Sequence, residues 1–139
     1  MDNRLVVAIA VALTAVAAGC STPPAALGST TAKVTINGQS AGDATPVTCA
    51  QTGWLWTIKT GNEAKGFTAA LDTGDQVTVQ SVDFRDFGGF TGTFWKGNIG
   101  EAEVQGDSGK YTITGSADGA FADNPSNAVT ATFRIEANC

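Results

Sequence analysis

The sequence contains no histidine, and this absence removes several kinds of active site. A Ser-His-Asp or Cys-His mechanism uses an imidazole as its general base, and histidine is also the commonest metal ligand. Positive charge is scarce too, with 8 Lys and Arg against 13 Asp and Glu and a formal net charge of -5. Nucleic-acid-binding proteins carry a basic patch, so this balance argues against a nucleic-acid partner.

Long apolar stretches are also missing. The chain has no uninterrupted run of about 20 apolar residues, the length that a membrane-spanning helix needs. The 139 residues instead hold 17 glycines together with many Thr, Val and Ala. This composition favours strands and turns over helices, and the length fits one domain.

The N-terminal residues have the pattern of an export signal. Residues 1–4 form a short polar start with one cation, Arg4, and residues 5–18 form an uncharged run whose only polar side chain is Thr14. A charged start, an apolar run of this length and small residues at its end are typical of a secretory signal peptide, here residues 1–19. The alternative is a buried N-terminal helix, but the run has no polar face to present to water.

Cys20 follows this signal directly. The preceding Ala17, Ala18 and Gly19 make the segment resemble a bacterial lipobox, although Leu is usual where Ala17 stands. The resemblance implies diacylglycerol on the Cys20 thiol, cleavage before Cys20 and an acyl chain on the new amino group. Two or three chains would form a stable membrane anchor, since each buried methylene adds about 0.8 kcal/mol. The alternative to lipidation is that Cys20 is an ordinary thiol near the signal cleavage site of a secreted protein.

The other two cysteines, Cys49 and Cys139, are expected to form a disulfide. Disulfides persist in exported proteins, and a bridge here would close a long loop. Two free buried thiols would better suit a cytosolic protein. We expect both sulfurs to face the core, because Cys49 has the parity of Val47 and Cys139 that of Phe133.

Residues 20–32 are predicted to be the lipidated cysteine and a flexible linker rich in Ser, Thr, Pro and Ala. The hydroxyls between Ser21 and Thr31 are potential sites for O-linked sugars, on composition alone. Residues 33–139 then form a β-rich domain. Short apolar runs separated by Gly, Asp and Asn predict an antiparallel β-sandwich of about seven to eight short strands, closed by one disulfide.

Apolar parity gives two local predictions. Val77 and Val79 are odd-numbered whereas Val82 and Phe84 are even, so the pattern changes phase near residues 80–81. This predicts a β-bulge there or a strand that is apolar on both faces. In residues 54–59, Trp54, Trp56 and Ile58 are expected to share one face of a strand.

Four short segments, together with the lipobox, carry a family resemblance. In order along the chain they are residues 34–38, 47–49, 111–115 and 133–139. They resemble the mycobacterial LpqH-type lipoproteins, the 19-kDa lipoprotein antigen family, over nearly all of residues 20–139. The resemblance implies a host-exposed, lipid-anchored envelope antigen on the extracytoplasmic side of the membrane, with an acylated N-terminus sensed by Toll-like receptor 2.

Several motifs resemble parts of catalytic sites, but none of them forms a complete site. Residues 38–42 match the G-x-S-x-G nucleophile elbow around Ser40, but no helix pattern follows them and no histidine exists to activate the serine. The acidic pairs Asp72/Asp75, Asp83/Asp86 and Glu101/Glu103 lack EF-hand spacing and are better interpreted as turn or solvated residues. We therefore expect no enzyme, no metal and no cofactor, and a hydrolase is the weakest hypothesis.

The aromatic residues leave one alternative function open. Residues 84–95 hold five of the eleven aromatics, and the Gly88-Gly89 pair suggests a mobile loop beside them. Exposed rings there would make an envelope lipid- or glycolipid-binding module, whereas buried rings would cap one end of the sandwich. The candidate ligand patch is Trp54, Trp56, Phe87, Phe90, Phe94 and Trp95.

Overall fold

The computed structural model describes residues 30–139, and every regular element in that range is a strand. No helix in this range is long and apolar enough to cross a membrane. The strands are β1 (Thr31–Ile36), β2 (Gln39–Ser40), β3 (Thr45–Pro46), β4 (Thr48–Thr52), β5 (Leu55–Gly61), β6 (Gly66–Asp72), β7 (Thr78–Phe87), β8 (Phe90–Trp95), β9 (Glu101–Asp107), β10 (Lys110–Phe121) and β11 (Val129–Asn138).

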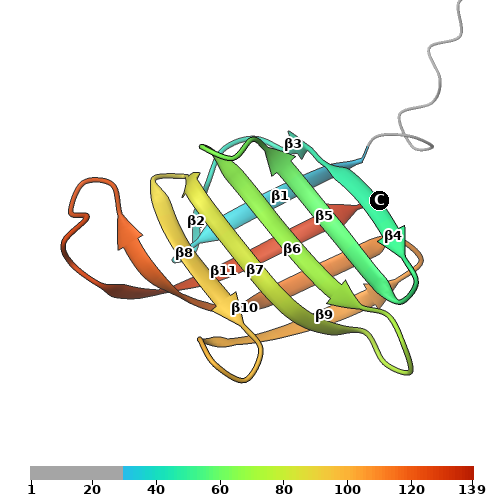
Figure 1. Cartoon of the computed structure of the whole chain (residues 1–139). Helices are drawn as coiled ribbons and strands as arrows, with labels where there is room; N and C mark the ends of the chain where they lie inside the picture. The colour runs from blue at the N-terminus through green and yellow to red at the C-terminus, as the bar shows by residue number, and fades with distance from the viewer. Residues whose placement is uncertain (1–29) are drawn as a thin grey trace, which may run out of the picture.

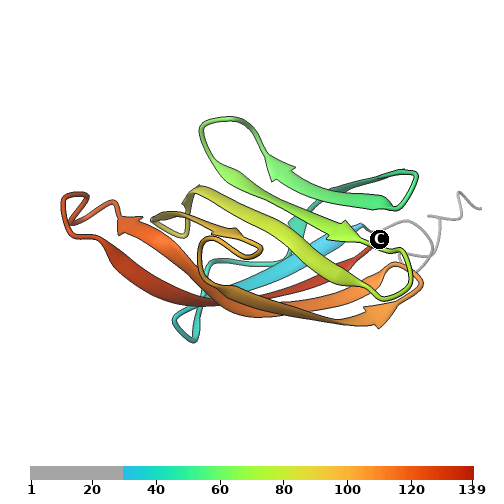
Figure 2. The same cartoon turned by 60° about the horizontal axis from the view of Figure 1, so that its bottom comes forward.

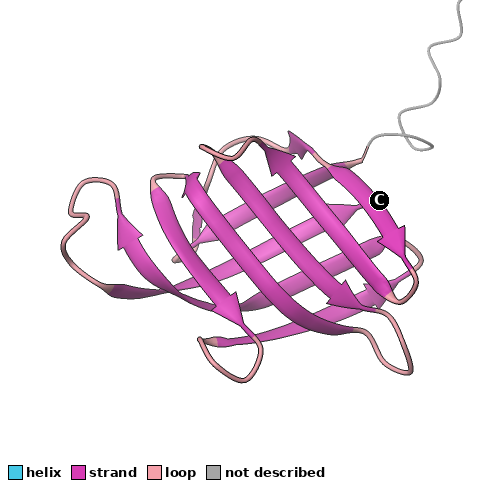
Figure 3. Ribbon diagram, viewed as in Figure 1, coloured by secondary structure: helices cyan, strands magenta, loops and turns pink. Residues whose placement is uncertain are grey.

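All the strands belong to one antiparallel sheet that curls into two layers, as Figures 1 and 3 show. Its order is β2-β1-β11-β10-β8-β7-β6-β5-β4, with β3 paired to β1 and β9 paired to β10. Strands β4 to β8 form one layer, and β1, β9, β10 and β11 run across the other (Figure 2). The predicted antiparallel all-β fold is confirmed.

The long strand β10 joins the two layers. Its first part, Lys110 to Ser116, pairs with β9, and its last part, Asp118 to Phe121, pairs with β8. Strands β9 and β8 therefore lie one after the other along the same edge of β10. Strand β11 occupies the opposite edge along almost the whole length of β10.

The core lies between the layers and follows the period of two expected for strands. In β11 the buried residues alternate with exposed Thr132, Arg134 and Glu136. The ring of Phe84 sits 5.3 Å from that of Phe133 in the opposite layer, centroid to centroid, and 5.8 Å from that of Phe90. The fully buried large side chains are Phe67, Phe84, Phe90, Ile58, Leu71, Ile113, Ile135 and Val82.

The phase change in β7 is a bulge, as predicted. Ser81 pairs with Ala70 of β6, but Val79 pairs with Leu71, so Gln80 has no partner residue on β6. The extra residue turns the side chains on both sides of it inward. Val79 and Val82 are consequently both buried despite their opposite parity.

The strand count exceeds the prediction for two reasons. Strands β2 and β3 have two residues each, too few to show an apolar alternation. Strand β8 lies within the segment for which an aromatic loop was one of two alternatives, because Gly88 and Gly89 form a two-residue turn between Phe87 and Phe90. In addition, β1 begins at Thr31 and pairs there with Asn138, so the last two residues assigned to the linker are part of the sheet.

Candidate functional site

Cys20 and the predicted signal peptide lie outside the described residues. The structure does show where the domain begins. Thr31 pairs with Asn138 of β11 and with Pro46 of β3, so the first strand starts beside the last residues of the chain. Figure 1 shows the beginning of β1 close to the C-terminus.

The disulfide between Cys49 and Cys139 is present and links the two layers. Cys49 lies in the edge strand β4, and Cys139 follows β11 in the other layer, with their Cα atoms 5.9 Å apart. Cys49 packs partly against the core, as predicted. Cys139 follows directly after β11 and is exposed as a residue.

A buried hydrogen bond supports the same side of the molecule. The Thr60 side chain in β5 is 4% exposed, and its hydroxyl donates to the Pro46 carbonyl at 2.8 Å. Thr60 and Pro46 belong to different layers. The disulfide and this hydrogen bond therefore join β4 and β5 to the opposite layer, and we call this the disulfide side.

Three residues of the candidate aromatic patch belong to the interior. Phe90 and Phe94 are buried, and Phe87 packs edge-on against Phe67 with ring centroids 5.5 Å apart. The tight turn at Gly88-Gly89 brings β8 back along β7, which directs these rings into the core. Of the two alternatives for this segment, the structure therefore supports the buried rings and not the exposed aromatic loop.

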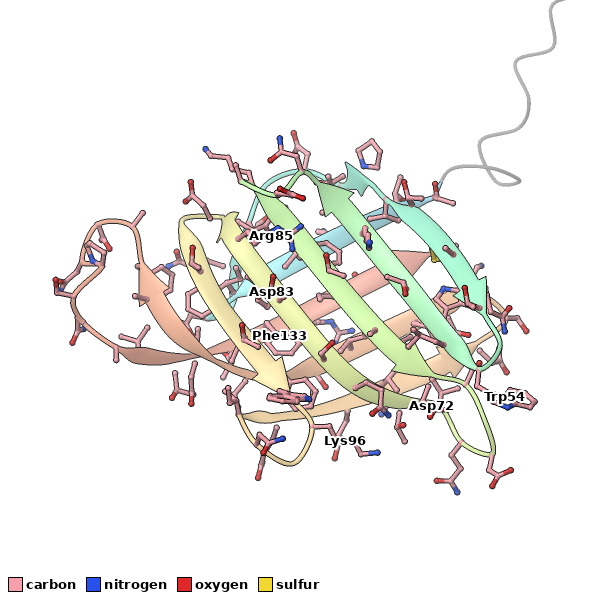
Figure 4. The ribbon with its side chains drawn as sticks, in the orientation of Figure 1. Trp54, Asp72, Asp83, Arg85, Lys96 and Phe133 are labelled. Carbon is pink, nitrogen blue, oxygen red and sulfur yellow. A yellow bond between two sulfur atoms is a disulfide. The ribbon has the colours of Figure 1, made fainter. Side chains whose placement is uncertain are left out.

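The three tryptophans are placed differently from one another. Trp54 is 70% exposed in the turn between β4 and β5, so it does not continue the inward face of Trp56 and Ile58 (Figure 4). Trp56 is half-buried and lies edge-on to Tyr111 with ring centroids 5.9 Å apart. Trp95 is 57% exposed at the end of β8. The six aromatic residues therefore do not form one surface patch.

The polar residues raised as catalytic candidates serve local structure. The Ser40 hydroxyl donates to the carbonyl of Gly42 at 2.8 Å within a turn. The Asp72 carboxylate accepts the backbone N–H of Gly74 at 2.9 Å, which is the expected turn chemistry. Glu101 and Glu103 are exposed. Within residues 30–139, no three Asp, Glu or Cys side chains gather as a metal site would require.

Asp83 and Arg85 form a hydrogen-bonded group on the outer face of β6, β7 and β8 (Figure 4). Arg85 donates to Asp83 and to the hydroxyl of Thr68, both at 3.1 Å, and the Thr93 hydroxyl donates to Asp83 at 3.0 Å. These bonds link three neighbouring strands and use both carboxylate oxygens. The group is a structural feature of the sheet surface.

Several surface hollows border β9, and sequence reasoning missed the following two. One, of about 570 Å³, is polar and lies over Glu101, Glu103, Thr114, Ser116 and Thr132. The other, of about 350 Å³, lies between β7 and β9. These two strands face each other without pairing, and we call the space between them the seam. No sequence signal could reveal the seam, because it depends on how β10 divides its edge between β8 and β9.

The fold and the disulfide together define a small all-β domain whose two layers are joined by one disulfide. The chain belongs to the family of the Mycobacterium 19 kDa lipoprotein antigen, which it matches over residues 25–139. The resemblance seen in the sequence is thereby confirmed.

Individual relatives agree with this assignment. The chain is 37% identical over its full length to all of "Probable lipoprotein LppE" of Mycobacterium tuberculosis. It is also 39% identical to a protein of Mycobacterium avium subsp. hominissuis whose name describes a lipoprotein. That match covers all of this chain and 97% of the relative. Lipoprotein LpqH of Mycobacterium avium is 32% identical over 77% of this chain and 67% of its own length. Membership in a lipoprotein family associates the chain with the cell membrane or envelope.

Proposed function

We propose that the protein is a non-catalytic envelope lipoprotein, acylated on Cys20 and held on the extracytoplasmic side of the membrane. The observation that carries this proposal is the family match over residues 25–139, directly after a lipobox-like segment that ends at Cys20. In this proposal the β domain is the displayed antigen. The acylated N-terminus is the part that host Toll-like receptor 2 senses.

The physical role of the anchor follows from the energetics of acyl chains. One chain gives only weak, reversible membrane binding, whereas two or three give stable attachment. The domain itself is acidic, with a formal net charge of -5 for the whole chain, so attraction to anionic lipids cannot replace the chains. Attachment in this proposal therefore depends on the Cys20 sulfur.

The described side chains also support a non-catalytic role. The candidate nucleophile Ser40 hydrogen-bonds within its own turn, and Asp83 is bonded to Arg85 and Thr93. A general base or acid needs a reacting group within hydrogen-bond reach, usually in a cleft with a perturbed pKa. The candidate groups here lie on the sheet surface or in turns.

Substitution of Cys20 tests the anchor. Wild-type protein expressed in a mycobacterial host should partition into the detergent-rich phase of Triton X-114, and Cys20→Ser should move to the aqueous phase or the culture fluid. Ser21→Ala is the matched control and should behave as wild type. Firm membrane retention of the Cys20→Ser protein would contradict the proposal.

The receptor step needs its own measurement. Protein purified from the mycobacterial host should activate reporter cells that express Toll-like receptor 2, and the Cys20→Ser protein should not. Reporter cells without the receptor are the control. Equal activation by the two proteins would show that the β domain, and not the acylated N-terminus, is the signal.

A second candidate function is the binding of an acyl lipid, and the seam favours it. Phe94, a member of the candidate ligand patch, lines the hollow of about 350 Å³ between β7 and β9. Its lining combines apolar and polar residues, and a hollow of this size lies within the range of small-ligand sites. The aromatic loop on which this function first rested is absent, but the seam offers an apolar surface in its place.

A further inference from the structure

The seam arises from the pairing of β10. Strand β8 pairs with the end of β10, from Asp118 to Phe121, and β9 pairs with the part from Lys110 to Ser116. Strand β7 is next to β8 and so comes to lie across from β9. Their Cα atoms approach within 8 Å, but no ladder pairs the two strands.

Apolar side chains line this gap from both strands. Val79 and Phe94 are each 3% exposed and form its inner surface. Val77, Ala102 and Val104 are half-buried around them. The seam is therefore a place where the described core is incompletely covered, and apolar surface there remains in contact with water. Covering that surface with an apolar group is favourable.

The width of the seam distinguishes between two kinds of occupant. An inserted peptide strand would need about 4.8 Å on each side, or roughly 9.6 Å in all, which is more than the closest approach of β7 and β9. Gly106 and the charged Glu103 on β9 are also features that discourage pairing at a sheet edge. A hydrocarbon chain needs neither that width nor backbone hydrogen bonds.

The hollow is lined by one cationic residue, Lys96, at one end of the seam, and by one acidic residue, Glu103 of β9. Lys96 follows β8, lines the hollow and is exposed. Its backbone N–H donates to the carbonyl of Gln80 at 2.9 Å, which fixes the residue beside β7. Among residues 30–139, Lys96 has no ion-pair partner. Figure 4 shows its side chain at the margin of the layer formed by β4 to β8.

From these observations we propose that the seam binds the alkyl chain of a single-chain fatty acid, with its carboxylate beside Lys96. The chain lies along residues 102–105 of β9, a length of about 13 Å at 3.3 Å per residue. The hollow of about 350 Å³ accommodates one chain, so a free fatty acid fits where a lipid with several chains does not. The proposal rests on the second candidate function above and names the ligand class and the site.

A fatty acid whose chain matches the length of the seam tests the proposal directly. Decanoic acid is titrated by calorimetry into the chain carrying Cys20→Ser, which cannot be acylated at residue 20. We expect saturable binding of one molecule per protein. The affinity should strengthen about fourfold per methylene from octanoic to decanoic acid. Failure to bind decanoic acid, or an affinity independent of chain length, would overturn the proposal.

Variants locate the site. Ala102→Phe places a ring in the seam and should weaken binding by about tenfold or more. Ala50→Phe adds the same ring to the exposed face of β4 and is the matched control, expected to bind as the parent does. Lys96→Glu should weaken fatty-acid binding by about twofold to fivefold and leave a fatty alcohol unaffected. If Ala102→Phe and Lys96→Glu both bind the fatty acid as the parent does, the seam is not the binding site.

Two further measurements separate the possible failures. Because Lys96 is exposed, Lys96→Glu should keep the melting temperature of the parent, so that variant remains informative even if Ala102→Phe does not fold. Native mass spectrometry of protein from its own envelope reports any copurifying lipid. A lipid that remains bound in Ala102→Phe would overturn the seam as the site but leave lipid binding in place.

Discussion

The two sides of the sandwich are closed in different ways. On the disulfide side, the Cys49–Cys139 bond and the hydrogen bond from Thr60 to Pro46 join the layers. On the other side, β8 pairs with β10 at one end, and the seam between β7 and β9 stays unpaired at the other. The disulfide thus lies beside β4, the last strand in the sheet order. The seam lies where β8 and β9 share one edge of β10.

Removing the disulfide should have the largest effect on stability. The bond spans 90 residues, and the chain-entropy model gives a loss of about 4–5 kcal/mol for a loop of that size. We expect this loss for Cys49→Ala/Cys139→Ala, measured by guanidinium unfolding in a Cys20→Ser background. Reduction of the parent protein is the control and should give the same loss. A loss of about 1 kcal/mol or less would mean that the disulfide side does not depend on the bond.

Two phenylalanine variants compare the packed interior with the seam. Phe67 is fully buried against Phe84 and Phe87, so Phe67→Ala should cost about 3–5 kcal/mol. Phe94 borders the hollow, and Phe94→Ala should cost about 1 kcal/mol less, because fewer atoms surround its ring. Urea unfolding measures both. Equal losses would show that the seam is packed as tightly as the centre.

The smallest expected effect is at Thr60. Thr60→Val keeps the shape of the side chain but leaves the Pro46 carbonyl without its donor, which should cost about 1–2 kcal/mol. Thr60→Ser retains the hydroxyl and should recover the part of the loss that belongs to the hydrogen bond. Thermal unfolding of the two variants gives the comparison. A Val variant more stable than the Ser variant would assign the role of Thr60 to packing alone.

Local features of the fold could be predicted from the sequence because they depend on neighbouring residues. The alternation in residues 131–137 and the phase change at Gln80 both reflect the period of a strand. The disulfide could be predicted from the small number of cysteines and the export signal. The signal and the lipobox are read from the sequence alone and stay predictions.

Features that depend on distant pairing could not be predicted. The sequence left two alternatives for the aromatic segment because Gly88-Gly89 suits a loop and a hairpin turn equally well, and the pairing of Phe87 with Phe90 decides between them. Trp54 has the parity of Trp56, yet the β4–β5 turn begins before it and leaves it in water. The seam depends on the shared edge of β10, which no local pattern encodes.

The most direct test is the intact mass of the protein isolated from its native envelope, recorded before and after reduction. We expect a polypeptide that begins at Cys20 and carries diacylglycerol with an additional acyl chain. It should gain the mass of two hydrogen atoms when the Cys49–Cys139 bond is reduced. An unmodified polypeptide, or one that retains residues 1–19, would contradict the proposed anchor.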